Sequence, residues 1–271
     1  MHWLSHGPRR YGRQMISHDV SGSGPALLLL HAGVADSRMW EPQREALART
    51  YRVIRCDLRG YGRTPLTTEP FDNAHDVREL LEHLGVDRTA VVAASAGGHV
   101  GLQVASAWPG LVSDLVLVNA AYDLPPTRSL QRFARREDAL IEAGDIDGAT
   151  ELNVATWLGP EADDAARDLV RTMQRHAFEV QLAVEEDAEQ EGPDIDLGAV
   201  TARTLVVSGG QDLDHFRAVA AHLASHVPGA RHVQLGWAGH LPNLERPDEV
   251  TALLTDFLAE APAGRTAARD A

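Results

Sequence analysis

Six short apolar runs, separated by helical patterns, set the main constraint on how this chain can fold. The runs are Ala26–His31, Tyr51–Asp57, Thr89–Ser95, Leu115–Ala120, Thr204–Gly209 and Arg231–Leu235. Most are nearly continuous in hydrophobicity rather than alternating, which is typical of strands covered on both faces in a parallel sheet. Apolar residues at helical spacing follow Asp72 or Asn73, with Gly85 as a stop signal, and again follow Pro247. Strands that alternate with helices predict an α/β layered domain.

The alternation is interrupted between Tyr122 and Ala199. Three helical segments are predicted there, at about 128–143, 146–157 and 162–182, separated by glycine and proline. We therefore expect residues 1–122 and 200–260 to form an α/β core, and residues 123–199 to form a helical cap on it. A second helical layer without a special role is the alternative interpretation of this insertion. The small, polar residues 261–271 predict a disordered tail.

Composition excludes several classes of function. The chain has 271 residues and one cysteine, Cys56, so it can form neither an intrachain disulfide nor a cysteine-based zinc cluster. All 25 basic residues are arginine, and the lack of lysine excludes Schiff-base chemistry and a P-loop lysine. A net charge of −14 argues against nucleic acid as a partner. The acidic stretch from Glu179 to Asp196 predicts a solvated face or loop.

Neither a membrane span nor a secretory signal is evident. The longest aliphatic stretch, Ala26–Leu30, is far below the roughly 20 residues that cross a bilayer. Met1–Arg10 lacks the apolar segment of a signal peptide. We expect a cytoplasmic protein that acts on a small molecule as a monomer or homodimer, without a membrane or nucleic-acid partner.

Ser95 ends an apolar run and stands directly before Ala96-Gly97-Gly98. A strand that turns sharply into a helix needs small residues two positions before and two after the apex, and Ala93 and Gly97 occupy those positions. This is the arrangement of a nucleophile elbow, in which a strained backbone exposes the serine hydroxyl at the edge of the sheet. A turn residue or a helix cap is the alternative role of Ser95.

A candidate acid and a candidate base follow later in the chain. Asp212 comes just after the run Thr204–Gly209, and His240 lies in a loop between the last run and the last helix. Ligands of open parallel sheets bind beyond the carboxyl ends of the strands, where all three residues are expected. A serine needs a base, and the base needs an orienting acid. The order serine, aspartate, histidine is the one expected for this type of fold.

Gly33 follows the run Ala26–His31, where a tight turn can aim its N–H group toward Ser95. Together with the N–H of Ala96 it would give two donors for a developing oxyanion. A plain turn glycine is the alternative. We expect His31 to fix the geometry of this loop by hydrogen bonding rather than to act as the base.

These segments together resemble the α/β-hydrolase superfamily from about Met15 to Leu258. The motifs are LLLLHAGVADSRMW, DLRGYGRT at Asp57–Thr64, AASAGG at Ala93–Gly98, SGGQD at Ser208–Asp212 and AGHLPNLERPDEV at Ala238–Val250. The resemblance implies a mainly parallel eight-stranded sheet flanked by helices, an inserted helical cap after the sixth strand, and a Ser-His-Asp triad that needs neither cofactor nor metal. It implies Ser95 as nucleophile, Asp212 as acid, His240 as base, and Gly33 and Ala96 as the oxyanion hole.

Some positions depart from the family pattern. Ala32 and Ala93 replace glycines, and each adds one methyl group in a tight turn. Asp214 lies two residues from Asp212, and Asp123 follows a strand at which some relatives place their acid, so both are alternative acids. His99, one turn into the helix after Ser95, is a further candidate for the pocket.

The pattern is most similar to small capped hydrolases of the 3-oxoadipate enol-lactonase type. A serine nucleophile argues against the dehalogenases and epoxide hydrolases of the superfamily, which attack with aspartate. We expect a serine hydrolase of the carboxylesterase or lactonase type that cleaves a small ester or lactone through an acyl-enzyme. Its alternatives are a cofactor-free non-hydrolytic reaction, such as cyclisation or perhydrolysis, and a non-catalytic ligand-binding relative. The expected pocket walls are Val34, Met39, Trp40, Tyr122, Trp157 and Phe178.

Overall fold

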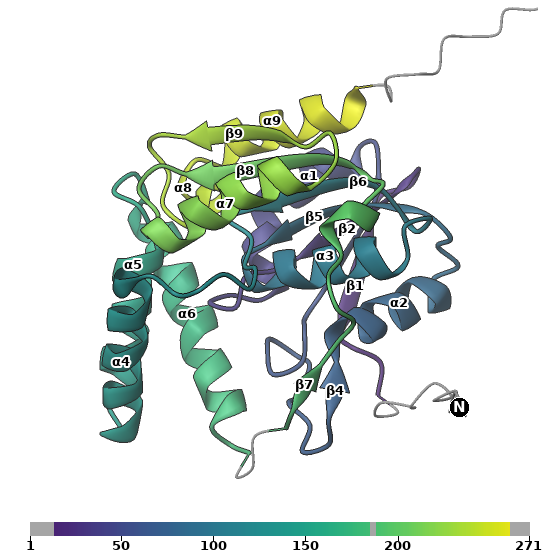
Figure 1. The fold of residues 1–271 in the computed structure, drawn as a ribbon. Helices are drawn as coiled ribbons and strands as arrows, with labels where there is room; N and C mark the ends of the chain where they lie inside the picture. The colour runs from purple at the N-terminus through teal and green to yellow at the C-terminus, as the bar shows by residue number, and fades with distance from the viewer. Residues whose placement is uncertain (1–13, 185–187, 261–271) are drawn as a thin grey trace, which may run out of the picture.

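A seven-stranded, mainly parallel sheet forms the centre of the protein (Figure 1). The structure, a computed structural model, describes residues 14–184 and 188–260. The strands are β1 (His18–Ser21), β2 (Ala26–Leu30), β3 (Arg52–Cys56), β5 (Thr89–Ala94), β6 (Val112–Val118), β8 (Arg203–Gly209) and β9 (Arg231–Leu235), in the spatial order β1-β3-β2-β5-β6-β8-β9. Only β1 runs antiparallel to its neighbour, β3. All six strands predicted from apolar runs are confirmed.

The expected eight-stranded sheet is corrected to seven strands within the described residues. The sequence pattern missed β1 because this edge strand, HDVS, is short and only partly buried, so it lacks a continuous apolar run. Two further residue pairs, β4 (Phe71–Asp72) and β7 (Gln190–Glu191), form a separate two-stranded parallel ladder. The predicted disordered tail, 261–271, lies outside the described residues.

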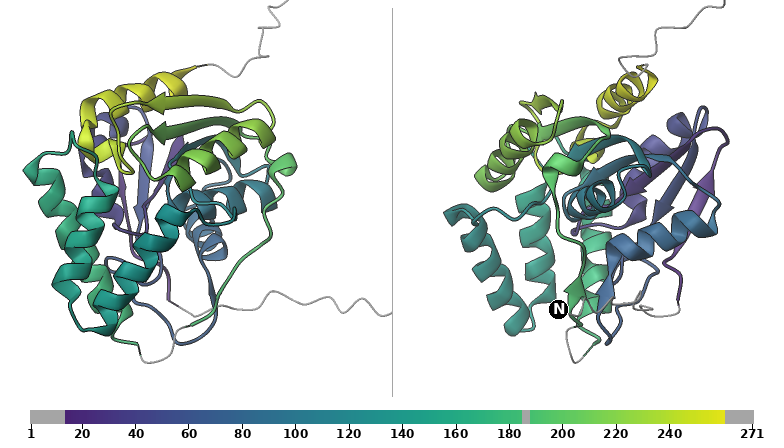
Figure 2. Two further views of the ribbon diagram at one scale, coloured as in Figure 1. Left: turned by 60° about the vertical axis from the view of Figure 1, so that its left-hand side comes forward. Right: turned by 45° about the vertical axis from the view of Figure 1, so that its right-hand side comes forward.

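Helices cover both faces of the sheet and explain the continuous apolar runs (Figure 1 and Figure 2). Leu28 and Leu30 of β2 pack with the helices α2 (Asn73–His83), α3 (Ala96–Ala107) and α7 (Asp214–His226). The alternate residues Leu27 and Leu29 pack with α1 (Glu41–Ala48) and α9 (Pro247–Ala259) on the opposite face. Successive side chains of a strand point to opposite faces, so both must be apolar here. The remaining short helices of the core are η1 (Ser37–Trp40), η2 (Leu197–Ala199) and α8 (Pro242–Glu245).

The insertion between β6 and β8 contains three helices, α4 (Arg128–Glu142), α5 (Ile146–Trp157) and α6 (Asp164–Gln181) (Figure 1). Their bounds match the predicted segments to within a few residues. Polar bonds tie them to the rest of the chain: Asp214 of α7 accepts hydrogen bonds from Thr127 and Ser129, and the ring of His176 on α6 donates to the Gly62 carbonyl at 2.8 Å. These bonds join the insertion to α7 on one side and to the loop after β3 on the other.

Helix boundaries follow the expected signals. The Asp72 side chain caps α2 by accepting from the N–H groups of Ala74 and His75, and Gly85 follows the helix with a φ of +66°. Pro247 is the first residue of α9. None of the helices within 14–184 and 188–260 is both long and apolar enough to cross a membrane.

Candidate active site

The turn from β5 into α3 holds Ser95 in a backbone conformation that L-residues rarely adopt. Its φ is +49° and its ψ −116°. The end of β6 and the residues after it hold Ser95 in place: the Ser95 N–H donates to the Val118 carbonyl at 3.0 Å, and the Ser95 carbonyl accepts from the Ala121 N–H at 2.9 Å. Strained backbone of this kind costs of order 1–3 kcal/mol and is concentrated at functional sites. The predicted sharp turn at Ser95 is confirmed.

Small residues around Ser95 let α3 lie close to the sheet. A Cβ atom on Gly97 would lie 2.4 Å from the His31 carbonyl oxygen, and a Cβ on Gly98 would lie 2.5 Å from the Ala120 methyl. The methyl group of Ala93, which stands where the family pattern has glycine, faces Gly101. A Cβ on Gly101 would lie 3.1 Å from it, so the helix glycine makes room for the extra methyl group.

His240 and Asp212 form a buried pair beyond the ends of β8 and β9. The Nδ1–H of His240 donates to Oδ2 of Asp212 at 2.6 Å, and Oδ1 of the same carboxylate accepts from the Leu213 N–H at 2.7 Å. The side chains are 2% and 0% exposed. A bond at Nδ1 fixes the neutral ring in the tautomer whose Nε2 can accept a proton. The rings of Phe216 and Trp157 flank the imidazole, with centroids 4.3 Å and 4.7 Å away.

Asn119 connects the two loops that carry this pair. It is fully buried directly after β6, with a φ of +45°. Its Oδ1 accepts from the Gly209 N–H at 2.8 Å, and its Nδ2 donates to the carbonyls of Gly239 and His240 at 3.1 and 2.9 Å. Sequence reasoning assigned Asn119 no role, although an asparagine directly after an apolar strand is a signal for left-handed backbone.

Glu245 fixes the other side of the histidine loop. Its carboxylate accepts from the Gly239 N–H at 2.9 Å and also from the N–H groups of Gly159 and Leu241. Burial raises the pKa of Glu245, while these backbone donors oppose the rise. Gly159 follows α5, so this carboxylate joins the helical insertion to the loop that carries His240. Its role was also missed from the sequence.

Gly33 and Ala96 lie next to each other beside Ser95. A Cβ on Gly33 would lie 3.5 Å from the Ala96 methyl and 3.3 Å from the Tyr61 hydroxyl. Among the described residues, the Gly33 N–H donates to no acceptor. Ala96 is the first residue of α3, so its N–H has no acceptor within the helix. Both N–H groups are thus available to an oxygen atom bound near Ser95.

His31 supports this loop, as predicted. It is fully buried, its Nδ1–H donates to the Ala32 carbonyl at 2.8 Å, and its Nε2 accepts from the Leu58 N–H at 2.9 Å. Burial lowers the pKa of His31, which agrees with a neutral ring used for positioning.

A cavity of about 240 Å³ brings Ser95, His240 and Gly33 together under the three inserted helices. Of the expected pocket walls, Val34, Trp157 and Phe178 line it. Met39, Trp40 and Tyr122 do not, which corrects the expectation for these three. Met39 and Trp40 are fully buried in the core beneath α1 and α9, and Tyr122 stacks on His222 at 5.3 Å. The sequence missed the polar lining, which is Tyr61, Glu137, Asn153, Gln174 and Gln181.

The alternative acids, Asp214 and Asp123, and the further candidate His99 do not line this cavity. Asp214 is exposed and binds Thr127 and Ser129 rather than His240. Asp123 and His99 line a different hollow, beside β7. Within the described residues, no group of three or more histidine, cysteine, aspartate or glutamate side chains has the geometry to hold a metal ion.

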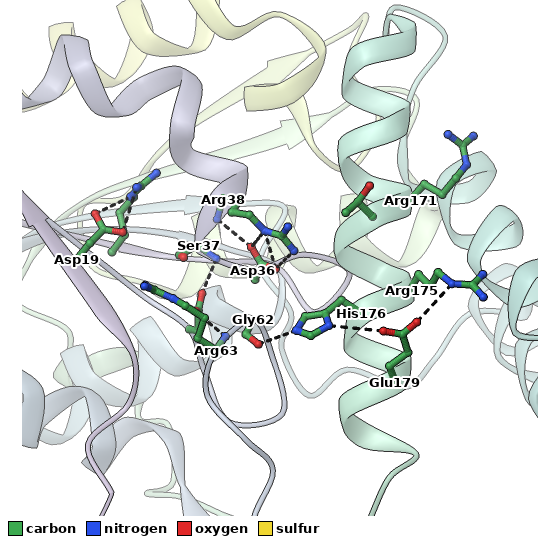
Figure 3. A pocket seen from close by; sticks show the side chains of 13 residues that line it. Asp19, Asp36, Ser37, Arg38, Gly62, Arg63, Arg171, Arg175, His176 and Glu179 are labelled. Carbon is green, nitrogen blue, oxygen red and sulfur yellow. Dashed lines mark hydrogen bonds and ion pairs between the residues drawn. The ribbon is translucent and has the colours of Figure 1, made fainter.

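A larger hollow of about 770 Å³ lies between α6 and the loops after β2 and β3 (Figure 3). Its charges are paired: Arg38 with Asp36 at 2.6 Å, Arg63 with Asp57 at 3.6 Å, and Arg175 with Glu179 at 3.4 Å. Figure 3 shows His176 between Gly62 and Glu179. Neither Ser95 nor His240 lines this hollow, so we place the candidate active site in the smaller cavity.

The first prediction concerns the turn after β5. Gly97→Ala should lower the free energy of unfolding by about 1–3 kcal/mol, because its methyl group meets the His31 carbonyl. Gly110→Ala is the matched control, since a Cβ there meets nothing within 4 Å, and we expect a change within about 0.5 kcal/mol. Chemical denaturation measures both. Equal stability of the two variants would contradict the close approach of α3 to β2.

The second prediction separates the two roles of Asn119. Asn119→Gly should lower the free energy of unfolding by about 2–4 kcal/mol, because three buried backbone groups lose their partner. Asn119→Ala should be less stable still by about 1 kcal/mol, because only glycine adopts the positive φ without strain. A glycine variant as stable as the natural protein, measured by denaturant unfolding, would show that the bonds contribute nothing.

Comparison with known proteins agrees with this geometry. A profile of the "Alpha/beta hydrolase family" matches residues 27–253. A protein of Klebsiella pneumoniae named "Putative carbamate hydrolase RutD" is 30% identical, with 87% of this chain and 92% of the relative covered. The solved structure "Est816 as an N-Acyl homoserine lactone degrading enzyme" has a TM-score of 0.73 at 25% identity, covering 89% and 96%. The enol-lactonase of Burkholderia xenovorans has a TM-score of 0.76 at 24% identity, covering 90% and 96%. This chain therefore belongs to the alpha/beta hydrolase family.

Proposed function

We propose that this protein is a serine hydrolase that cleaves a small ester or lactone through an acyl-enzyme on Ser95. One observation carries the proposal: His240, which is hydrogen-bonded to the buried Asp212, lines the same cavity as the strained Ser95 turn. A hydroxyl becomes a useful nucleophile when a base takes its proton and an acid orients that base. The names of two relatives, which refer to a carbamate and a lactone, support acyl transfer as the reaction class.

The proposed reaction has two stages, formation and hydrolysis of an acyl-enzyme on Ser95. His240 takes the Ser95 proton at Nε2 while the serine oxygen attacks the carbonyl carbon of the substrate. The resulting oxyanion is bound by the N–H groups of Gly33 and Ala96, and one such donor contributes about 2.7–4 kcal/mol in comparable sites. Asp212 stabilises the imidazolium, which then gives its proton to the leaving oxygen. Water, deprotonated by His240, releases the acyl group and restores Ser95.

The third prediction tests the nucleophile. A fluorophosphonate probe should add once to the natural protein and not at all to Ser95→Ala, as measured by intact-mass spectrometry. The same substitution should lower kcat for a p-nitrophenyl ester by roughly ten-thousandfold or more, because no other hydroxyl replaces the nucleophile. Labelling of the Ser95→Ala variant would assign the reactive group to another residue. A panel of esters, lactones and carbamates then identifies the preferred linkage.

The fourth prediction tests the acid. Asp212→Asn should lower kcat by about a thousandfold to ten-thousandfold, because an amide favours the wrong tautomer of His240. Asp214→Asn is the matched control, since this exposed carboxylate accepts hydrogen bonds from hydroxyl groups of the insertion and none from His240, and its kcat should stay within about twofold. Steady-state kinetics measure kcat of both variants. A strong loss in Asp214→Asn with an active Asp212→Asn would exchange their roles.

A further inference from the structure

A carboxylate faces the candidate active site without a cationic partner. Glu137 of α4 lines the cavity opposite the core residues Ser95 and His240. Among the described residues its one donor is Asn153, whose Nδ2–H reaches Oε1 at 2.5 Å. No arginine or histidine of the described ranges forms an ion pair with it. Burial therefore raises the pKa of Glu137, which the Asn153 bond opposes and the neighbouring Asp138 charge increases.

Asn153 holds this carboxylate in a fixed place and has no N–H donor left for a ligand. Its Oδ1 accepts from the indole N–H of Trp157 at 2.7 Å, and its Nδ2 donates both to Glu137 and to the Ala149 carbonyl at 3.0 Å. An asparagine side chain has two N–H donors, so both are used. The second carboxylate oxygen of Glu137 accepts no hydrogen bond from the described residues.

Gln174 supplies a second unused acceptor on the same wall. Its side chain is 5% exposed, it lines the cavity from α6, and its Oε1 is buried without a hydrogen-bond partner. A buried polar atom without a partner costs about 1–3 kcal/mol. The terminal torsion of glutamine is broad, so a rotation of the amide can present the oxygen to a ligand in the cavity.

Aromatic side chains form another part of the cavity lining. Phe133 stands one turn before Glu137 on α4, and its ring lies 4.7 Å from that of Trp157. Phe178 and Phe216 also line the cavity. Aromatic faces attract cations and are most effective where water is excluded. Apart from His240, the cavity lining contains no basic side chain to receive an anion.

We propose that the cavity selects substrates that carry an ammonium group, which would bind the Glu137 carboxylate and the Gln174 amide oxygen among the aromatic rings. The inference rests on the proposed function, because it defines which ester the Ser95 site would accept. A positively charged N–H donor satisfies both unused acceptors at once, whereas an alkyl chain leaves them without partners and a carboxylate meets a like charge.

Paired esters of equal shape test the proposal. We would compare p-nitrophenyl esters with acyl chains from propanoyl to hexanoyl, in which an ammonium group does or does not replace the terminal methyl group. At the best chain length, the natural protein should prefer the ammonium ester roughly tenfold or more in kcat/KM, as expected for a bond to a charged group. Glu137→Gln should remove this preference, because the charge that binds the ammonium group is lost.

Asp138→Asn is the matched control, since it removes the same charge from the next, exposed residue of α4. It should keep the preference for ammonium. If Asp138→Asn loses the preference as strongly as Glu137→Gln, the effect is one of overall charge and the proposal is overturned. If the natural protein shows no preference for ammonium at any chain length, the proposal is overturned without any variant.

A binding measurement separates this inference from the proposed reaction. In the Ser95→Ala background, methyl esters of the same acyl pairs would be titrated while the tryptophan indole N–H resonances are followed by NMR. Tighter binding of the ammonium ester that depends on Glu137, together with a natural protein that cleaves none of the esters, would support the inference and refute the proposed hydrolysis. Ester cleavage with equal binding of both partners would support the hydrolysis and overturn the inference.

Discussion

The clamp between Ser95 and β6 is the constraint on which the rest of the site depends. Two backbone bonds, to the Val118 carbonyl and from the Ala121 N–H, hold Ser95 at a positive φ. That conformation ends β5 and starts α3 within one residue, so the Ala96 N–H points to the same region as the serine side chain. The second strained residue, Asn119, lies in the clamping segment itself and orients the loops of Asp212 and His240. Ser95 and the loops that carry Asp212 and His240 are therefore held by the same short segment, residues 118–121.

The parts of the fold that depend on local pattern could be predicted from the sequence. Continuous apolar runs predicted the buried strands because each faces helices on both sides, and the glycines around Ser95 predicted a close approach that the Gly97 distances show. The edge strand His18–Ser21 could not be predicted, because pairing with β3 on one side leaves no apolar signature. The residues that line the pocket were predicted least accurately. Met39 and Trp40 are large and apolar, and nothing in their own sequence distinguishes a core position from a cavity wall.

The polar wall of the cavity escaped sequence analysis for a related physical reason. Glu137, Asn153 and Gln174 come from three different helices of the insertion, and a helix carries polar residues on its solvent face as a rule. Only the packing of α4, α5 and α6 over the core makes these particular positions face inward. The chemistry near Ser95 is encoded in short motifs, whereas the groups that face the substrate are brought together by tertiary structure alone. The motifs therefore indicate the reaction class and leave the substrate to be inferred from the assembled cavity.

Glu137 differs from several other carboxylates of this acidic chain in how the protein compensates its charge. The buried carboxylates Asp76, Asp36 and Glu245 are compensated by the protein: Asp76 pairs with Arg59 at 2.6 Å, Asp36 with Arg38, and Glu245 accepts backbone N–H groups. Arginine is the only basic residue besides histidine in this chain. It suits the pairing of carboxylates because its planar guanidinium group can donate two parallel hydrogen bonds to one carboxylate. The large charged hollow beside α6 follows the same rule, with each acid matched by a cation. Glu137 is half-buried at the candidate active-site cavity and has neither a cation nor a backbone donor among the described residues, and an ammonium group of the substrate would supply the missing charge.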